Sequence, residues 1–377
     1  MITVPLTPDL VRGVAELEPT DRGLVLHRLP AWVRRQLPDP QLMSMETQPS
    51  GARVAFRTTA TRVELEFRSS RVAYVGADRP RGRVDAFVDG TLVTTDEITG
   101  GDAVEVNLLT GSTRPVQGDP HTTVLAGLSP TDKLVELWLP HNEALTLVAL
   151  RADAPAVPDD RPRRRWVHHG SSISQGSAAT SPSLIWPALA ARAADLELRN
   201  LGFGGAAMAD QCLARVIRDT PADVISIKLG INIVNADAMR LRAFIPAMHG
   251  FLDTVRDGHP ETPLFLVTPI YCPIHEDTPG PGAFDMATIG SPQVRFIATG
   301  DPAEVASGRL TLRSIRDALT QIAATRDDRN LHLIDGLSLF GPTDEAAHPL
   351  ADALHPDTAS HELIGTRFAE QALTRLD

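Results

Sequence analysis

The stretch Trp166-Val-His-His-Gly170-Ser-Ser-Ile-Ser-Gln-Gly176 decides the fold expected for the second half of the chain. Its first four residues are typical of a strand, and the glycines and serines that follow are typical of a loop. Downstream, apolar strand-like runs alternate with helical patterns. Further strands are expected over residues 196–200, 224–229, 264–268 and 331–335, and helices over residues 184–194, 209–218, 238–256, 310–325 and 359–376.

Five strands that alternate with helices predict an α/β domain, in which a parallel sheet carries helices on both faces. Ligands of such sheets bind beyond the carboxyl ends of the strands, so functional residues are expected in the loops that follow strands. Trp166 and Trp186 are expected in the core of this domain.

Upstream, residues 51–151 alternate apolar and polar positions, as half-buried antiparallel strands do. Asp89-Gly90 lies between two such runs and predicts a two-residue hairpin turn. Several short strands with turns between them predict a β-sandwich, with a short helix expected over residues 31–36. Residues 153–165 are polar and rich in proline and arginine, which is typical of a domain junction. We therefore expect a sandwich domain over 1–152, a linker over 153–164 and the α/β domain over 165–377.

Composition limits the function classes. The chain has 377 residues, enough for two domains of about 150 residues or more each. Its net charge of −11 disfavours binding to nucleic acid, and two cysteines exclude a disulfide framework. No window approaches the roughly 18 apolar residues that span a membrane, and the N-terminus lacks the pattern of a secretion signal. We expect a cytoplasmic protein with no membrane partner.

Four loops, all expected at the same end of the sheet, carry residues that are able to take part in catalysis. They contain Ser171, Ser172 and Ser174; Asn200 and Gly205; Gly230 and Asn232; and Asp352 with His355. A serine hydroxyl becomes a nucleophile when histidine takes its proton, and a carboxylate three residues before that histidine can fix its tautomer. A glycine N–H and an asparagine amide are suitable donors to the oxyanion that then forms. Each motif is common alone, but together they indicate acyl transfer.

These blocks resemble those of the SGNH (GDSL-type) hydrolase family. Gly170-Ser-Ser172-Ile-Ser is similar to its Gly-Asp-Ser block, Asn200 and Gly205 to the second, Gly230-x-Asn232 to the third, and Asp352-x-x-His355-Pro to the last. The resemblance implies a three-layer, flavodoxin-like domain. It also implies roles for the residues at the matching positions: Ser172 as nucleophile, His355 as base, Asp352 as its partner, and Ser172, Gly205 and Asn232 as oxyanion donors.

Two positions depart from the family pattern. Ser171 stands where the family has aspartate before the nucleophile, and Ile233 stands where it often has aspartate after the asparagine. Neither position holds a reacting group, so the implied mechanism is unaffected. The family includes members with an N-terminal sandwich similar to a carbohydrate-binding module, among them acyltransferases that modify natural products.

The resemblance implies an enzyme without a cofactor or metal. We expect it to move an acyl group from an ester or thioester donor, such as acyl-CoA as a substrate, to a hydroxyl of a bulky small molecule. The missing signal favours this over an esterase that acts on carbohydrates or small esters, which remains the alternative. A non-catalytic carbohydrate-binding protein is the remote alternative. The sandwich is expected to help form the substrate pocket.

Residues 271–308 show no clear element, and long loops of this kind often shape a binding site. The candidate substrate contacts there are Tyr271, His275, Phe284 and Phe296. Cys272 is expected to fill space in the core, with pocket lining as the alternative.

Two other motifs suggest different functions. Gly202-x-Gly204-x-x-Ala207 formally fits a dinucleotide fingerprint, but it follows the second strand and lacks an acidic partner after the next one. His168 and His169 are adjacent on a strand, so their side chains point to opposite faces and cannot easily share a metal ion.

Overall fold

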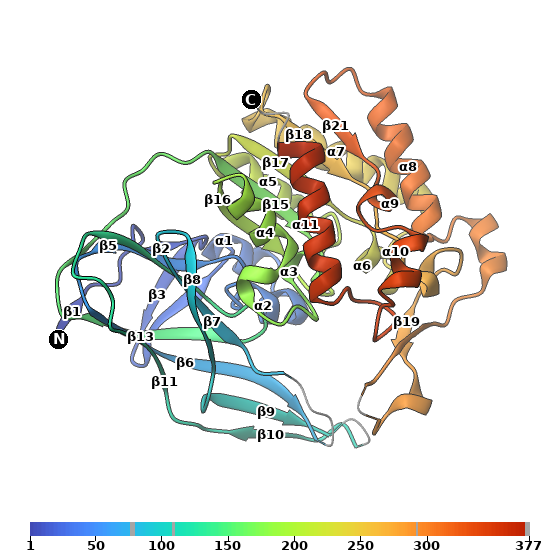
Figure 1. Cartoon of the computed structure of the whole chain (residues 1–377). Helices are drawn as coiled ribbons and strands as arrows, with labels where there is room; N and C mark the ends of the chain where they lie inside the picture. Colours follow the sequence, from blue (N-terminus) through green and yellow to red (C-terminus); the bar gives the residue numbers. More distant parts are fainter. Residues whose placement is uncertain (76–79, 108–109, 292, 374–377) are drawn as a thin grey trace. The chain divides into compact units, whose positions relative to one another are not determined.

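The structure, a computed structural model, describes residues 1–75, 80–107, 110–291 and 293–373 (Figure 1). The chain divides into two compact units. Unit 1 contains residues 1–31, 43–162 and 180–183, and unit 2 contains residues 32–42, 163–179 and 184–377. The segment 32–42, expected in the sandwich domain, thus groups with the second unit.

Unit 1 contains two mainly antiparallel sheets. The larger sheet consists of β1 (Ile2–Val4), β3 (Glu16–Thr20), β4 (Gly23–His27), β6 (Arg62–Tyr74), β9 (Asp102–Val106), β10 (Thr113–Val116), β11 (His121–Ala126) and β13 (Ala144–Ala152). The smaller sheet consists of β2 (Val11–Arg12), β5 (Arg53–Thr58), β7 (Arg83–Val88), β8 (Thr91–Glu97), β12 (Lys133–Trp138) and β14 (Ala156–Val157). Part of the expected linker is therefore a strand, because β14 pairs with β5.

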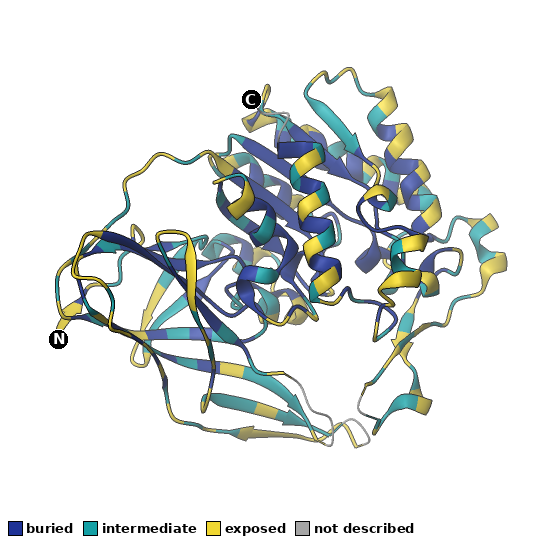
Figure 2. Cartoon of the chain, in the orientation of Figure 1, coloured by how far each residue is buried: buried dark blue, intermediate teal, exposed yellow. Residues whose placement is uncertain are grey.

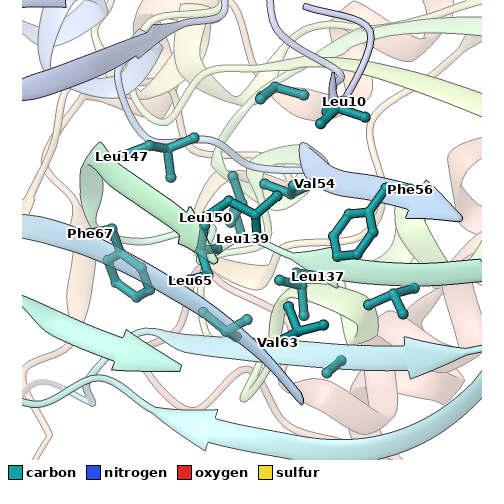
Figure 3. Packing of buried hydrophobic residues seen from close by; sticks show 14 of the residues in the cluster. Leu10, Val54, Phe56, Val63, Leu65, Phe67, Leu137, Leu139, Leu147 and Leu150 are labelled. Carbon is teal, nitrogen blue, oxygen red and sulfur yellow. The ribbon is translucent and has the colours of Figure 1, made fainter. Parts of the chain in front are cut away.

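The core of unit 1 forms from alternate residues of both sheets. Leu65 and Phe67 of β6 lie in one buried cluster with Val54 and Phe56 of β5 and Leu137 of β12 (Figure 3). This is the packing expected of a sandwich. The turn between β7 and β8 has positive φ at both Asp89 and Gly90, as the sequence predicts.

Unit 2 is built on one parallel sheet. Its strands are β15 (Arg165–Gly170), β16 (Glu197–Gly202), β17 (Val224–Lys228), β18 (Leu264–Val267) and β21 (Leu331–Ile334). They lie in the order β16-β15-β17-β18-β21, and every neighbouring pair is parallel. This is the flavodoxin-like order, so the expected fold class is confirmed.

Two helical layers cover this sheet (Figures 1 and 2). On one face α4 (Trp186–Ala193) packs against α11 (Thr358–Ala372); on the other, α7 (Leu241–Gly258) packs against both α5 (Gln211–Asp219) and α8 (Leu312–Thr325). Trp166 and Trp186 are fully buried, as expected. The last residues of the helix expected over 359–376 lie outside the described residues. None of the described helices is long and apolar enough to cross a membrane.

Short elements complete the chain. They are α1 (Ala31–Gln36), α2 (Pro40–Glu46), α3 (Ser172–Gln175), η1 (Pro182–Leu184), α6 (Ile231–Asn235), α9 (Gly336–Leu339) and α10 (Pro342–Ala347). Residues 271–308, which show no clear element in the sequence, hold several short ones. They contain η2 (Pro273–His275), β19 (Gly282–Phe284), η3 (Met286–Thr288), β20 (Phe296–Ala298) and η4 (Pro302–Ser307), and β19 pairs with β20. Strands this short carry no readable periodicity.

The chain has two lysines, and both are buried. In unit 1, Lys133 Nζ donates hydrogen bonds to the backbone oxygens of Thr58, Ser129 and Thr131, at 3.2, 2.7 and 3.2 Å. In unit 2, Lys228 ends β17, and burial lowers the pKa of its ammonium from 10.5 to about 8. Folding therefore opposes the charged form of Lys228.

We predict that Lys228→Met stabilises the protein near neutral pH. The charged lysine costs folding free energy at any pH below about 8, and the cost disappears as pH rises through 10.5, where the unfolded chain also loses its proton. The free energy of unfolding should rise by about 2–3 kcal/mol at pH 7 and by much less at pH 10. Urea unfolding at both pH values measures this.

Lys133→Met is the matched control, because it removes the donor from three backbone oxygens. It should lower the free energy of unfolding at both pH values. A Lys228→Met variant that is less stable than the wild type at pH 7 would contradict the prediction.

Candidate active site

Ser172, His355 and Asp352 form one hydrogen-bonded chain. Ser172 Oγ lies 2.9 Å from His355 Nε2, and His355 Nδ1 lies 2.7 Å from Asp352 Oδ2. Ser172 is the first residue of α3, directly after β15, and the other two residues lie in the loop before α11. The fold of unit 2 thus brings these three residues together at one end of the sheet.

The Asp352 carboxylate is fixed from two sides. Its Oδ1 accepts hydrogen bonds from the backbone N–H groups of Leu354 and His355, at 2.9 and 2.7 Å. Burial raises the pKa of Asp352, but its hydrogen bonds with the His355 ring and with the backbone outweigh burial, so the pKa is below 3.8. An ionised Asp352 can only accept hydrogen bonds, so Nδ1 of His355 carries the proton and Nε2 presents a lone pair to Ser172.

The nucleophile turn uses Ser171 as a helix cap. Ser171 Oγ accepts a hydrogen bond from the backbone N–H of Ile173 at 3.3 Å. At this position, where the family has aspartate, serine provides the capping oxygen without a charge. Ser172 then lies in the first turn of α3, where backbone N–H groups have no intrahelical acceptor. Its N–H is available to an oxyanion.

The second and third loops supply two more donors. Gly205 has a φ of 69°, in the left-handed region that favours glycine, and its backbone is exposed. Asn232 Oδ1 accepts a hydrogen bond from the backbone N–H of Ala207 at 3.2 Å, which leaves the Asn232 NH₂ group as a donor. Ile233 is fully buried, so the family's second aspartate is replaced by a core residue.

Asn200 joins the nucleophile helix to the second loop. Its Nδ2 donates to the backbone oxygen of Ser174, and its Oδ1 accepts from Gly202 N–H, both at 2.9 Å. A Cβ at Gly202 would lie only 2.5 Å from the backbone nitrogen of Gln175, so the close packing requires glycine here. Gln175 Oε1 in turn accepts from Gly204 N–H at 2.7 Å. Side chains of the protein thus occupy the N–H groups of both fingerprint glycines, Gly202 and Gly204, which disfavours the dinucleotide interpretation.

His168 and His169 have structural roles, on opposite faces of β15. His168 bonds to Ser226 and Ser174 through its two ring nitrogens, each at 2.7 Å, whereas His169 Nδ1 bonds to the backbone oxygen of Leu201. Burial holds the pKa of His168 well below 6.5 and lowers that of His169 to about 4, so both rings are neutral. Within the described residues, no group of three or more histidine, cysteine, aspartate or glutamate side chains is arranged for a metal ion.

The candidate substrate contacts lie in different places. The ring centroids of Phe296 and His355 lie 5.8 Å apart, edge to face. The backbone N–H of Phe296 donates a hydrogen bond to the backbone oxygen of Asp352 at 2.8 Å. Phe284 lies 5.0 Å from Phe296 and is 40% exposed. Tyr271 is half-buried, and its backbone bonds to Phe340.

His275 does not fit the role expected of it. It is fully buried, and its ring nitrogens lie 3.1 Å from the backbone oxygen of Thr278 and 3.2 Å from Asn235 Oδ1. A ring without exposed surface cannot contact a substrate in this structure. The structure thus turns this side chain inward, which a loop sequence does not reveal, and its substrate contact stays a prediction.

Cys272 lies beneath the histidine loop. It is buried, and Sγ donates to the backbone oxygen of Ala353 at 3.5 Å. Burial raises the pKa of the thiol to about 12, so it is not a nucleophile. Its role is packing against the loop that carries Asp352 and His355.

Two glutamines at the site have no sequence signal. Gln175 lies in the nucleophile loop but in no motif position, and Gln41 comes from the distant segment 32–42. Gln41 Nε2 donates to the backbone oxygen of Gly204 at 2.8 Å. No spacing rule connects residues 163 positions apart in the chain.

Comparisons with known families match both parts of the chain. Residues 163–273 match the GDSL-like lipase/acylhydrolase family, and residues 10–148 match the family of the SsfX3 N-terminal domain. No curated protein matches the chain.

Several solved structures share the fold over nearly the whole length. The salicylyl-acyltransferase SsfX3 from a tetracycline biosynthetic pathway is 25% identical, with a TM-score of 0.76 over 97% of this chain and 94% of its own. A putative GDSL-like lipase from Bacteroides ovatus is 17% identical, with a TM-score of 0.68 over 97% and 95% of the two chains. An acetyl xylan esterase from Butyrivibrio proteoclasticus is 11% identical, with a TM-score of 0.56 over 98% and 96%.

The last two likenesses concern the fold alone. Together with the two family matches, SsfX3 confirms the resemblance to SGNH (GDSL-type) enzymes that carry an N-terminal sandwich. The chain joins a GDSL-like lipase/acylhydrolase domain to an N-terminal domain of the SsfX3 type, and it is a serine enzyme of the SGNH class.

Proposed function

We propose that this protein is an acyltransferase that moves an acyl group from an ester or thioester donor to a hydroxyl of a bulky small molecule. The observation that carries the chemistry is the continuous hydrogen-bonded chain from Ser172 through His355 to Asp352. It provides a nucleophile, a base with a free lone pair and a carboxylate that fixes the base.

In the first half-reaction, Ser172 Oγ attacks the acyl carbonyl carbon while its proton moves to His355 Nε2. The resulting oxyanion accepts hydrogen bonds from Ser172 N–H, Gly205 N–H and the Asn232 amide. The loss of one such donor in other enzymes slows the reaction about 10²–10³-fold. When the C–S or C–O bond to the leaving group breaks, His355 returns the proton to that group. The product is an acyl ester of Ser172.

In the second half-reaction, His355 Nε2 takes the proton of an acceptor hydroxyl, whose oxygen attacks the acyl ester. Collapse of the second tetrahedral intermediate returns the proton to Ser172 Oγ. An alcohol acceptor gives a new ester, and water gives the free acid. A bound alcohol outcompetes water because binding supplies a high effective concentration at the reacting carbon.

Similarity to SsfX3 favours transfer over hydrolysis. The match extends over 97% of this chain, so it includes unit 1 as well as the unit that carries the triad. We propose an activated acyl donor such as acyl-CoA, as a substrate, and a role for unit 1 in binding the acceptor. Hydrolysis is the second candidate, and the family match of residues 163–273 to lipases and acylhydrolases favours it.

Product partition tests the proposal. Wild-type protein is mixed with a p-nitrophenyl ester and increasing concentrations of an aromatic alcohol, and the new ester and free acid are quantified by chromatography. We expect ester to replace acid as the alcohol concentration rises. Ser172→Ala should form both products at least about 10³-fold more slowly than the wild type, because no acyl-enzyme forms.

The matched control for Ser172→Ala is Ser177→Ala, which removes the hydroxyl of a serine that is near α3 but outside the proposed chemistry. It should retain wild-type rates. Free acid as the sole product at saturating alcohol would establish an esterase. Equal activity of Ser172→Ala and wild type would refute the serine mechanism.

The β19–β20 hairpin gives the proposal a second test. Phe296 lies beside His355 and Phe284 lies against Phe296, so the pair presents aromatic surface that an aromatic acceptor can bury in part. Phe284→Ala should lower kcat/KM for a bulky aromatic alcohol about 10-fold, which corresponds to about 1.4 kcal/mol. Hydrolysis of a small acetyl ester should be unchanged.

Met286→Ala is the control for this variant. Met286 lies in the same hairpin and is 68% exposed, but it is not part of the aromatic pair. Equal losses in the two variants, or a loss of acetyl ester hydrolysis with Phe284→Ala, would contradict an acceptor-binding role for Phe284.

A further inference from the structure

The segment 32–42 is held against α5, the helix that follows the loop with Gly205. The Arg215 guanidinium carbon lies 4.4 Å from the Trp32 ring centroid, which is cation–π geometry. The same guanidinium donates a hydrogen bond to Gln36 Oε1. These two contacts fix the segment against α5.

Gln41 extends from this segment to the loop itself. Its Nε2 donates to the backbone oxygen of Gly204 at 2.8 Å. Its side-chain atoms would lie 3.1–3.4 Å from a Cβ placed on Gly205, so the amide packs directly against that glycine. Because Gly204 N–H donates to Gln175, glutamine side chains hold both polar backbone groups of Gly204.

The geometry of the peptide bond connects Gln41 to the oxyanion. The oxygen of Gly204 and the N–H of Gly205 belong to one planar peptide group, in which they point in opposite directions. Holding the oxygen therefore sets the direction of the N–H. A hydrogen bond to the oxygen also polarises the group and strengthens its N–H as a donor. Glycine on both sides would otherwise let this peptide rotate easily.

We infer that Gln41 is a positioning residue for the oxyanion hole: it holds the Gly204–Gly205 peptide so that the Gly205 N–H points at the developing oxyanion. The inference rests on the proposed function, because it acts through a donor of that mechanism. Segment 32–42 then contributes to the site through Gln41. Gln41 is exposed, so water competes for Gly204, and its removal should cost less than the loss of a donor.

The test uses Gln41→Met, which keeps the length of the side chain and removes the donor. Gln41→Glu is the second variant, because it places a carboxylate oxygen against the Gly204 oxygen. Both kcat and KM are measured with p-nitrophenyl acetate and with the corresponding thionoester. We expect kcat for the oxygen ester to fall about 10-fold in Gln41→Met and at least as far in Gln41→Glu, with KM within twofold of the wild type.

The thionoester separates positioning from general structural damage. Sulfur accepts hydrogen bonds weakly, so the oxyanion donors contribute little to this reaction, and its rate should change less than twofold. Gln36→Met is the matched control: it lies in the same segment and contacts Arg215 but not Gly204. It should keep wild-type kcat with both substrates, because Trp32 still holds the segment.

Wild-type kcat in Gln41→Met, or equal losses with the oxygen ester and the thionoester, would overturn the positioning role. A wild-type protein without turnover of the oxygen ester would instead refute the proposed function, and the inference with it. If the wild type turns over the oxygen ester and the Gln41 variants do so at the same rate, the proposed function is supported and the role of Gln41 is refuted. Thermal unfolding of each variant establishes that it is folded.

Discussion

The hydrogen bond between Ser172 and His355 joins loops that are 183 residues apart in the chain. A parallel sheet makes this pairing achievable, because all its strands end at the same edge and their following loops converge there. β15 delivers the serine, and the loop before α11 delivers the histidine. Apart from the aromatic pair Phe284 and Phe296, the other described features of the site either hold one of these loops in place or provide a donor beside them.

Each loop is fixed by groups that take no part in bond making. Asn200 ties α3 to the loop after β16, and the close approach at Gly202 keeps the two together. Cys272 supports the histidine loop through Ala353, while the Asp352 carboxylate accepts two backbone N–H groups of its own turn. Because these contacts are made within the protein itself, the donors and the base need little rearrangement during the reaction.

Much of the fold and the placement of the triad could be predicted from sequence because both rest on local patterns. Apolar runs mark the strands, and Ser172 and Asn232 follow strands almost directly, so the sheet topology places them. Gln41 could not be found, because its contact with Gly204 depends on the path of a distant segment rather than on any spacing. The β19–β20 hairpin escaped prediction because its strands are too short, and the inward turn of His275 depends on packing.

The identity of the nucleophile is the central claim, and Ser171 and Ser174 lie close enough in sequence to be confused with it. The most direct measurement is peptide mapping by mass spectrometry after rapid mixing with an activated ester and acid quenching. The acyl mass should appear on Ser172 at nearly one equivalent per chain and should be absent from His355→Ala at the same time point. Acylation of Ser171 or Ser174, or no acylated serine at all, would contradict the claim.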